Sequence, residues 1–126
     1  MHSTAKFAFA ALGLAPTVLG AKLIASHYTG AVFTLDLKLD GGVSTLSSQA
    51  KVDGCGQLPG WLEYYPEDKT LYCFDESWYG SGLIASYNVS DDGSLKLFGQ
   101  TPTTGNDVHG LLYGGPKGKS FVATAQ

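Results

Sequence analysis

Short runs of apolar and β-branched residues alternate with turn residues along most of the chain. The turns are rich in glycine, proline and aspartate, as in residues 66–68, 80–82 and 91–93. Runs of this length, bounded by such turns, are typical of β-strands. After residue 21, no segment keeps the period of about 3.6 residues that marks an amphipathic helix. The pattern therefore predicts an all-β protein.

The strand pattern is repeated within the chain. Residues 59–71 align with residues 109–121, because both contain a glycine, an apolar pair and Pro-x-x-Lys followed by Thr or Ser. Residues 71–76 align with residues 23–28 and 121–126, and residues 82–89 align with residues 30–37. A repeat of roughly 40 to 50 residues with four short antiparallel strands is typical of a β-propeller blade.

The repeat divides the chain into parts of three blades. With strand a innermost, we expect strands b, c and d of a first blade in residues 22–50, a complete blade in residues 58–101, and strands a and b of a third in residues 109–126. A propeller closes with about 4 to 8 blades, so the predicted fold is an incomplete β-propeller of about two and a half blades. A fragment of a longer product, an assembly of several chains and an open stack all fit this pattern, and we favour the fragment. Uncovered blade faces predict self-association.

The first 21 residues have the pattern of a secretory signal peptide. His2 and Lys6 give the chain a short basic start. An uninterrupted run of Phe, Ala, Leu and Gly follows from Phe7 to Ala15, and Pro16 ends it. This order predicts cleavage after residue 20 or 21, with a buried helix and a signal anchor as the alternatives. We therefore expect a secreted, extracellular protein. We expect no membrane association after cleavage, because no later apolar run approaches the ~18 residues of a membrane span.

Secretion sets the interpretation of two short features. Cys55 and Cys73, 18 positions apart, predict one disulfide in an oxidising compartment. We expect no metal site, because too few Cys and His residues lie near one another. Asn88-Val89-Ser90 is an N-glycosylation sequence, which a secreted chain can use at Asn88.

Composition argues against several classes of function. The 126 residues carry a net charge of −3, and all eight basic residues are lysines. A nucleic-acid binder usually has an arginine-rich basic patch, so we expect no nucleic-acid partner. The chain contains no Gly-x-Ser-x-Gly nucleophile motif, no His-Glu-x-x-His motif, no phosphate-binding glycine loop and no EF-hand loop.

The sequence of the complete blade resembles a known family. Residues 58–62 (Leu-Pro-Gly-Trp-Leu) and residues 66–76 (Pro-Glu-Asp-Lys-Thr-Leu-Tyr-Cys-Phe-Asp-Glu) resemble the blade motif of lactonase-type seven-bladed propellers. This family includes bacterial 6-phosphogluconolactonases and fungal carboxymuconate cyclases. Glu67-Asp68-Lys69 stands where the family usually has Asp-Gly-Arg. The turns at residues 40–42 and 91–95 match as well, and Gly54-Cys55-Gly56 is most similar to the secreted fungal branch.

The resemblance implies lactone chemistry without a cofactor. Family members hydrolyse a sugar lactone or close a muconate into one, so the implied enzyme is a lactonase or a lactonising cyclase acting on a small lactone or carboxylate. Their site lies in the central channel, where the d–a and b–c loops meet, and uses acid, imidazole and arginine groups. This chain has no arginine and covers about the first third of a seven-bladed member, so we expect it to be inactive as it stands. The alternative is a non-catalytic propeller module that binds carbohydrate or another protein.

Two residues are the candidates for catalysis. Glu76 ends strand b of the complete blade, and His109 starts strand a of the next blade, so blade geometry places both on one face. A carboxylate and an imidazole there are suited to general acid–base work at a lactone. The structural alternative is a solvated loop acid and an ordinary surface histidine.

Other residues are candidates for substrate binding or packing. His27 and Tyr28 hold the equivalent strand end in the first blade, and Trp78 lies beside Tyr79 in the b–c loop, so we expect His27, Tyr28 and Trp78 to line the same mouth. We expect Trp61 and Tyr64 to pack in the core and Asp75 to fix a turn. We expect Lys117 and Lys119 to be solvated.

Overall fold

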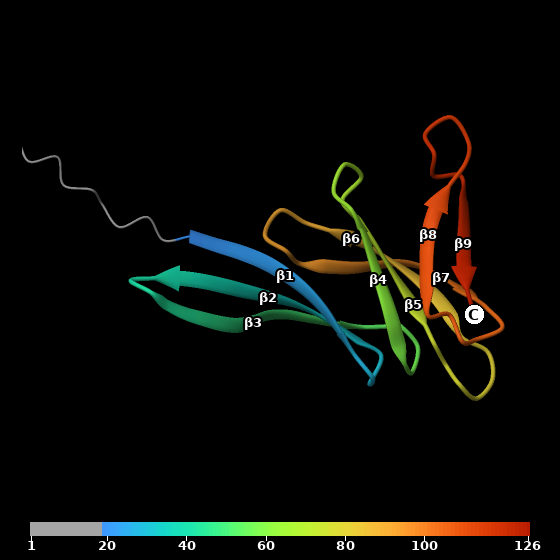
Figure 1. Ribbon diagram of the computed structural model, residues 1–126, viewed down its shortest axis with the longest axis horizontal. Helices are drawn as coiled ribbons and strands as arrows, with labels where there is room; N and C mark the ends of the chain where they lie inside the picture. The colour runs from blue at the N-terminus through green and yellow to red at the C-terminus, as the bar shows by residue number, and fades with distance from the viewer. Residues whose placement is uncertain (1–18) are drawn as a thin grey trace, which may run out of the picture.

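A computed structural model of the protein describes residues 19–126. In this range the chain forms nine strands and no helix (Figure 1). The strands are β1 (Leu19–His27), β2 (Ala31–Asp40), β3 (Val43–Asp53), β4 (Pro59–Tyr65), β5 (Thr70–Asp75), β6 (Leu83–Val89), β7 (Leu95–Pro102), β8 (His109–Tyr113) and β9 (Phe121–Ala125). The all-β prediction is confirmed.

The strands form three antiparallel sheets in which each strand pairs only with its neighbours along the chain. Sheet 1 has the order β1-β2-β3, sheet 2 has β4-β5-β6-β7, and sheet 3 has β8-β9. The sheets follow one another in chain order (Figure 1), with β4 in contact with β1 on one side and with β8 on the other. These are the blades of an incomplete β-propeller, as the repeat predicted.

Sheet 1 is longer than the sequence pattern indicated. It runs from Leu19 to Asp53, three residues beyond each bound of the expected range 22–50. The reason is that both hairpins keep pairing to their ends, with Leu19 opposite Leu39 and Asp53 opposite Ala31.

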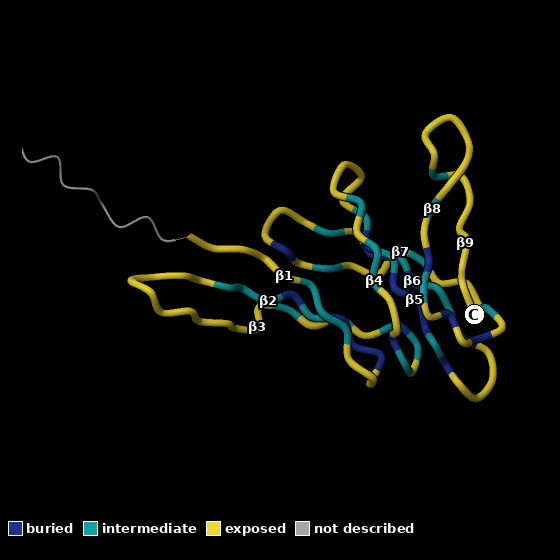
Figure 2. The backbone as a smooth tube through the Cα atoms, viewed as in Figure 1, coloured by how far each residue is buried: buried dark blue, intermediate teal, exposed yellow. Residues whose placement is uncertain are grey.

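The main core lies between sheets 1 and 2 (Figure 2). Leu71 pairs with Tyr87, and Cys73 pairs with Ala85, so all four side chains lie on one side of sheet 2. They pack with Val32 of β2 in one buried cluster. Both sides of β5 are covered, because Gly110 of β8 packs on the Phe74 ring on the other side. This explains why β5 is apolar at consecutive positions instead of alternating.

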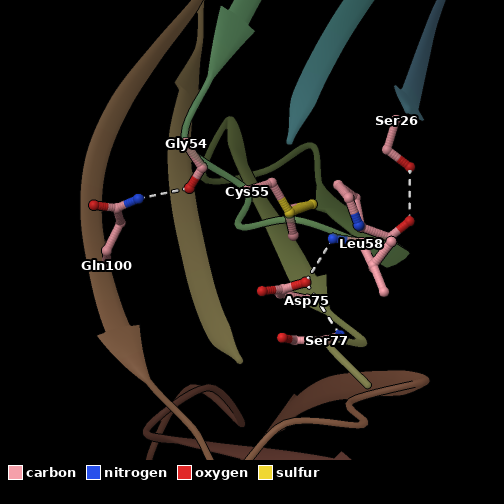
Figure 3. Close-up of a disulfide and its surroundings, with 9 residues drawn as sticks. Ser26, Gly54, Cys55, Leu58, Asp75, Ser77 and Gln100 are labelled. Carbon is pink, nitrogen blue, oxygen red and sulfur yellow. Dashed lines mark hydrogen bonds between the residues drawn. A yellow bond between two sulfur atoms is a disulfide. The ribbon is translucent and has the colours of Figure 1, made fainter. Parts of the chain in front are cut away.

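The predicted disulfide is present. Cys55, in the loop between β3 and β4, is bonded to Cys73 of β5, with the two Cα atoms 5.8 Å apart (Figure 3). Both residues are fully buried. The bond joins the loop that enters sheet 2 to the second strand of that sheet.

Tyr87 gives a prediction about alkaline stability. Its hydroxyl is buried without a hydrogen-bond partner among the described residues. Burial, helped by the negative charge of Asp53, raises the pKa of Tyr87 to about 12. Tyr87 therefore ionises less readily in the folded state than in the unfolded state. Its contribution to the free energy of unfolding is complete below about pH 10 and is lost as the pH rises towards 12. We expect the wild type to lose about 2–3 kcal/mol relative to Tyr87→Phe across that window.

Urea unfolding at neutral pH and at stepwise alkaline pH measures this difference. At neutral pH, the free energy of unfolding of Tyr87→Phe should equal that of the wild type or exceed it by up to about 1 kcal/mol, because the substitution removes an unpaired buried hydroxyl. Tyr79→Phe is the control, since Tyr79 is 91% exposed and its hydroxyl already contacts solvent. Parallel pH curves for the wild type and Tyr87→Phe would contradict the prediction.

The predicted signal peptide lies mostly outside the described residues. Residues 1–18 are not described, and Leu19, Gly20 and Ala21 pair with β2. The cleavage point therefore stays a prediction. Among residues 19–126, no helix is long and apolar enough to cross a membrane.

Candidate active site

The backbone of Glu76 is held between two loops that enter successive sheets. Glu76 follows the last residue of β5. Its N–H donates to the carbonyl of Leu58, 2.8 Å away, in the loop before β4. Its carbonyl accepts the N–H of Asn106, in the loop before β8. Glu76 therefore lies at the junction of the two d–a loops, where the family resemblance implied a site.

Two neutral donors orient the carboxylate of Glu76. Trp78 donates its indole Nε1–H to Oε1 at 2.7 Å, and Tyr28 donates its hydroxyl to Oε2 at 3.4 Å. Trp78 comes from the loop between β5 and β6, whereas Tyr28 comes from the β1–β2 turn of sheet 1. The structure thus brings together three of the five predicted site residues, from two sheets.

Asp75 anchors the chain directly before Glu76. Its buried Oδ1 accepts the N–H of Leu58 at 2.8 Å and the N–H of Ser77 at 3.2 Å (Figure 3). Gly56 packs against this carboxylate so closely that a Cβ at residue 56 would overlap it. Asp75 therefore has the turn-fixing role expected for it, and it sets the direction in which Glu76 leaves the strand.

His109 lies at the same end of the strands as Glu76, in the next sheet. It is the first residue of β8, and its half-buried ring packs on Trp61 with ring centroids 4.4 Å apart. Gly60 lies between Glu76 and the loop before β8, since a Cβ there would be 3.2 Å from the Cβ of Glu76 and 3.5 Å from the carbonyl of Asp107. Glu76 and His109 share no hydrogen bond within residues 19–126.

His27 is not brought into this group. Its Nδ1 lies 3.2 Å from Oγ1 of Thr29, within its own turn. Ser26 contacts the carbonyl of Pro59 in sheet 2. Because side chains alternate along a strand, His27 lies on the other side of β1.

Three expectations about packing and solvation need correction. Trp61 and Tyr64 are 36% and 42% exposed, because β4 is the inner edge strand of sheet 2 and has no strand beyond it. Lys119 is not simply solvated. Its ammonium binds the carboxylates of Glu67 and Asp68 and lies 4.6 Å from the centre of the Tyr65 ring.

The Lys119 contacts join the hairpins of sheets 2 and 3 at the end of the strands opposite Glu76. Hydrogen bonds to Asp68 and Glu67 raise the pKa of Lys119. The hydrogen bond between Lys119 and Glu67 also lowers the pKa of Glu67. These charged groups act on sheet packing and lie away from the candidate site.

A buried acid beside His109 was not singled out in the sequence. Asp107 is fully buried; its Oδ2 accepts the hydroxyl of Thr103, and its Oδ1 lies 3.3 Å from Nε2 of Gln126. In the sequence, Asn106-Asp107 has the composition of an ordinary turn. Only the tertiary structure shows that Asp107 contacts Thr103, after β7, and Gln126, after β9. These contacts hold the segment that leads into His109.

A cavity lies elsewhere in the structure. It has a volume of about 470 Å³ and lies between sheets 1 and 2, at the opposite end of the strands. Its lining includes Lys22, Ile24, Thr34, Tyr64, Val89 and Asp91, but neither Glu76 nor His109. The candidate site lies outside this cavity, among the loops at the ends of the strands. Among residues 19–126, no three His, Cys, Asp or Glu side chains gather as they would around a metal ion.

The sequence of the three sheets agrees with a family of known proteins. A sequence model described as Lactonase, 7-bladed beta-propeller matches residues 22–126. The chain belongs to this family. The match confirms the resemblance seen in the blade motif and covers all three sheets of this lactonase-like propeller. No curated protein and no solved structure shows a significant match to the chain.

Proposed function

We propose that the mouth around Glu76 and His109 is part of a site that hydrolyses a small-molecule lactone without a cofactor. The observation that supports this most directly is the orientation of the Glu76 carboxylate by Tyr28 and Trp78, at the point where two d–a loops meet. The lactonase family to which the chain belongs supplies the substrate class. Any arginine in the complete site has to come from outside this sequence, which has none.

The proposed roles follow from the chemistry of the two groups. Glu76 accepts a proton from water as the water oxygen attacks the lactone carbonyl. The ring C–O bond then breaks, and the leaving oxygen takes a proton from His109. A proton returned through solvent from Glu76 to His109 restores both groups, so the net change is the addition of one water. The reverse sequence closes a hydroxy acid into a lactone with loss of water. Closing a muconate is a different step, in which a carboxylate oxygen adds to a carbon–carbon double bond and the neighbouring carbon takes up a proton, with no water lost.

Glu76→Gln is expected to lower lactone turnover by about 100-fold, because the amide cannot take up the proton. The fold should be unaffected, since a glutamine oxygen still accepts one of the two donors. Hydrolysis of a sugar δ-lactone by a propeller in which further blades complete the site, followed by acid release, measures the effect. Glu67→Gln removes a carboxylate at the opposite end of the strands and is the matched control.

Full activity in Glu76→Gln would remove Glu76 from the mechanism. A completed wild-type propeller that binds carbohydrate but turns over no lactone would favour the alternative, a non-catalytic binding module. The observation in favour of that alternative is the exposed pair Trp78 and Tyr79 beside a carboxylate, because exposed aromatic rings stack on sugars.

We also propose that the protein is secreted. The buried disulfide between Cys55 and Cys73 supports an oxidising compartment. N-terminal sequencing of exported protein is expected to give Ala21 or Lys22 as the first residue. Glycosylation at Asn88 should add the mass of a sugar chain, and this added mass should be absent in Asn88→Gln. Exported material that begins at Met1 would contradict cleavage.

A further inference from the structure

The loop of residues 54–58, between β3 and β4, joins sheet 1 to sheet 2 at the candidate-site end of the strands. We call residues 54–58 the bridging loop. The N–H groups of Gly54 and Cys55 both donate to the carbonyl of Gly30, in the β1–β2 turn, at 3.2 and 3.1 Å. Cys55 is also bonded to Cys73 of β5. The bridging loop is therefore fixed on one side to the turn of sheet 1 and on the other side to sheet 2.

The second half of the bridging loop holds the chain around Glu76. The N–H of Leu58 donates to Oδ1 of Asp75 at 2.8 Å (Figure 3), and the carbonyl of Leu58 accepts the N–H of Glu76 at 2.8 Å. Oδ1 of Asp75 also accepts the N–H of Ser77 at 3.2 Å. The bridging loop thus links the turn that carries Tyr28 to the strand end that carries Glu76.

Gly56 lies at the centre of the bridging loop and touches both of its neighbours. A Cβ at residue 56 would overlap the buried carboxylate of Asp75, and a Cβ at Gly30 would overlap the carbonyl of Gly56. Gly56 also has a φ of +69°, in the left-handed region that glycine adopts at no steric cost. A methyl group at residue 56 therefore has to displace Asp75 or push the loop towards Gly30.

The contact between Tyr28 and Glu76 depends on this support. The side chain of Tyr28 is 55% exposed, and its hydroxyl donates to Oε2 of Glu76 at 3.4 Å. One exposed hydrogen bond is too weak to set the spacing of two sheets. The spacing is set beneath it, where the backbone of Gly56 lies between Gly30 and the Asp75 carboxylate.

We propose that Gly56 is a positioning residue of the candidate site, because the bridging loop holds Tyr28 and Trp78 at hydrogen-bond distance from the Glu76 carboxylate only when residue 56 has no side chain. Trp78 donates to Oε1 at 2.7 Å from the turn that Asp75 fixes. The inference rests on the proposed function, in which Glu76 accepts the proton from water. A misplacement of about 1 Å lowers the rate of such a step by up to about 100-fold.

Gly56→Ala tests this role against two matched alanine controls. Gly118 has nearly the same φ, +70°, and no atom lies within 4 Å of its Cβ position, so Gly118→Ala adds the backbone strain alone. Gly93 has a φ of +85°, and a Cβ there would lie 2.8 Å from side-chain carbons of Lys22 and Thr34. Gly93→Ala therefore disturbs the packing of sheets 1 and 2 at the opposite end of the strands.

The indole N–H of Trp78 reports the geometry of the site in the chain itself. The protein has two tryptophans, so Trp61→Phe assigns the Trp78 signal in a proton–nitrogen correlation spectrum, and Glu76→Ala gives its position without the hydrogen bond. Gly56→Ala is expected to move the Trp78 signal towards that position. Amide exchange at Leu58 should become about 10- to 100-fold faster. Neither alanine control should show these changes.

Lactone turnover by a propeller in which further blades complete the site tests the consequence. Gly56→Ala is expected to lower kcat by about 10- to 100-fold and to change KM by less than about threefold, while both controls keep the wild-type kcat. An unchanged kcat, an unmoved Trp78 signal, or an equal loss of kcat in Gly93→Ala would overturn the proposal. A completed wild type without lactone activity would contradict the proposed function, and the Trp78 signal would still decide the role of Gly56.

Asp75→Asn replaces Gly56→Ala if circular dichroism shows that Gly56→Ala has lost its strands. The amide has the shape of the carboxylate but accepts the N–H groups of Leu58 and Ser77 more weakly, because it carries no charge. The Trp78 signal should then move in the same direction by a smaller amount. A Trp78 signal that stays at its wild-type position in Asp75→Asn would overturn the proposal.

Discussion

Reduction of the Cys55–Cys73 disulfide is expected to lower the free energy of unfolding by about 3 kcal/mol. The two cysteines are 18 positions apart, so reduction frees a loop of the unfolded chain that the bond otherwise restricts. The loss is a large share of the stability of a small domain, which is about 5–15 kcal/mol. Urea unfolding of the wild type with and without a thiol reductant measures it.

The reduced wild type is the informative comparison because its thiols still fill the buried space. Cys55→Ala/Cys73→Ala removes the bond and leaves a void as well, so it should unfold at still lower urea. Equal midpoints for the oxidised and reduced wild type would show that the bond adds nothing to stability. Because Cys73 lies two residues before Asp75, we also expect faster amide exchange at Asp75 and Glu76 after reduction.

Gly110→Ala is expected to destabilise the protein by about 1–3 kcal/mol and to detach sheet 3 from sheet 2. A Cβ at residue 110 would overlap the ring of Phe74, which is fully buried, so sheet 3 has to move away from sheet 2. The contact between His109 and Trp61 should be lost in the same step, because His109 is the neighbouring residue. Amide exchange over residues 109–125 measures the detachment.

Gly99→Ala is the matched control for this substitution. Its Cβ would lie 3.5 Å from Oγ of Ser86, an ordinary contact distance, so its amide exchange should match that of the wild type. Phe74→Leu gives a second test, since a smaller side chain at residue 74 leaves room for the alanine methyl. The cost of Gly110→Ala should be smaller in Phe74→Leu than in the wild type. Additive costs would show that the ring is not what excludes the methyl group.

The approximate strand positions and the order of the blades were predictable from local sequence. Turns such as residues 66–68 and 91–93 have few alternatives to a hairpin, and the repeat made the same strands visible twice. The pairing of Cys55 with Cys73 was predictable for a simpler reason: two cysteines in an oxidising compartment allow one intramolecular bond. The positions of Glu76 and His109 at one end of the strands followed from strand direction alone.

Contacts between sheets were decided by the tertiary structure. Tyr28 and Trp78 reach Glu76 while His27 does not, and this depends on side-chain alternation at the end of β1 and on how sheets 1 and 2 pack. Asp107 and Lys119 have the sequence context of surface turns, yet one is buried and the other joins two hairpins. Sequence alone determined the strands, their order and the blade repeat, because those depend on residues close along the chain. Which polar groups meet between sheets depends on side chains up to about fifty residues apart, and only packing of the sheets brings them together.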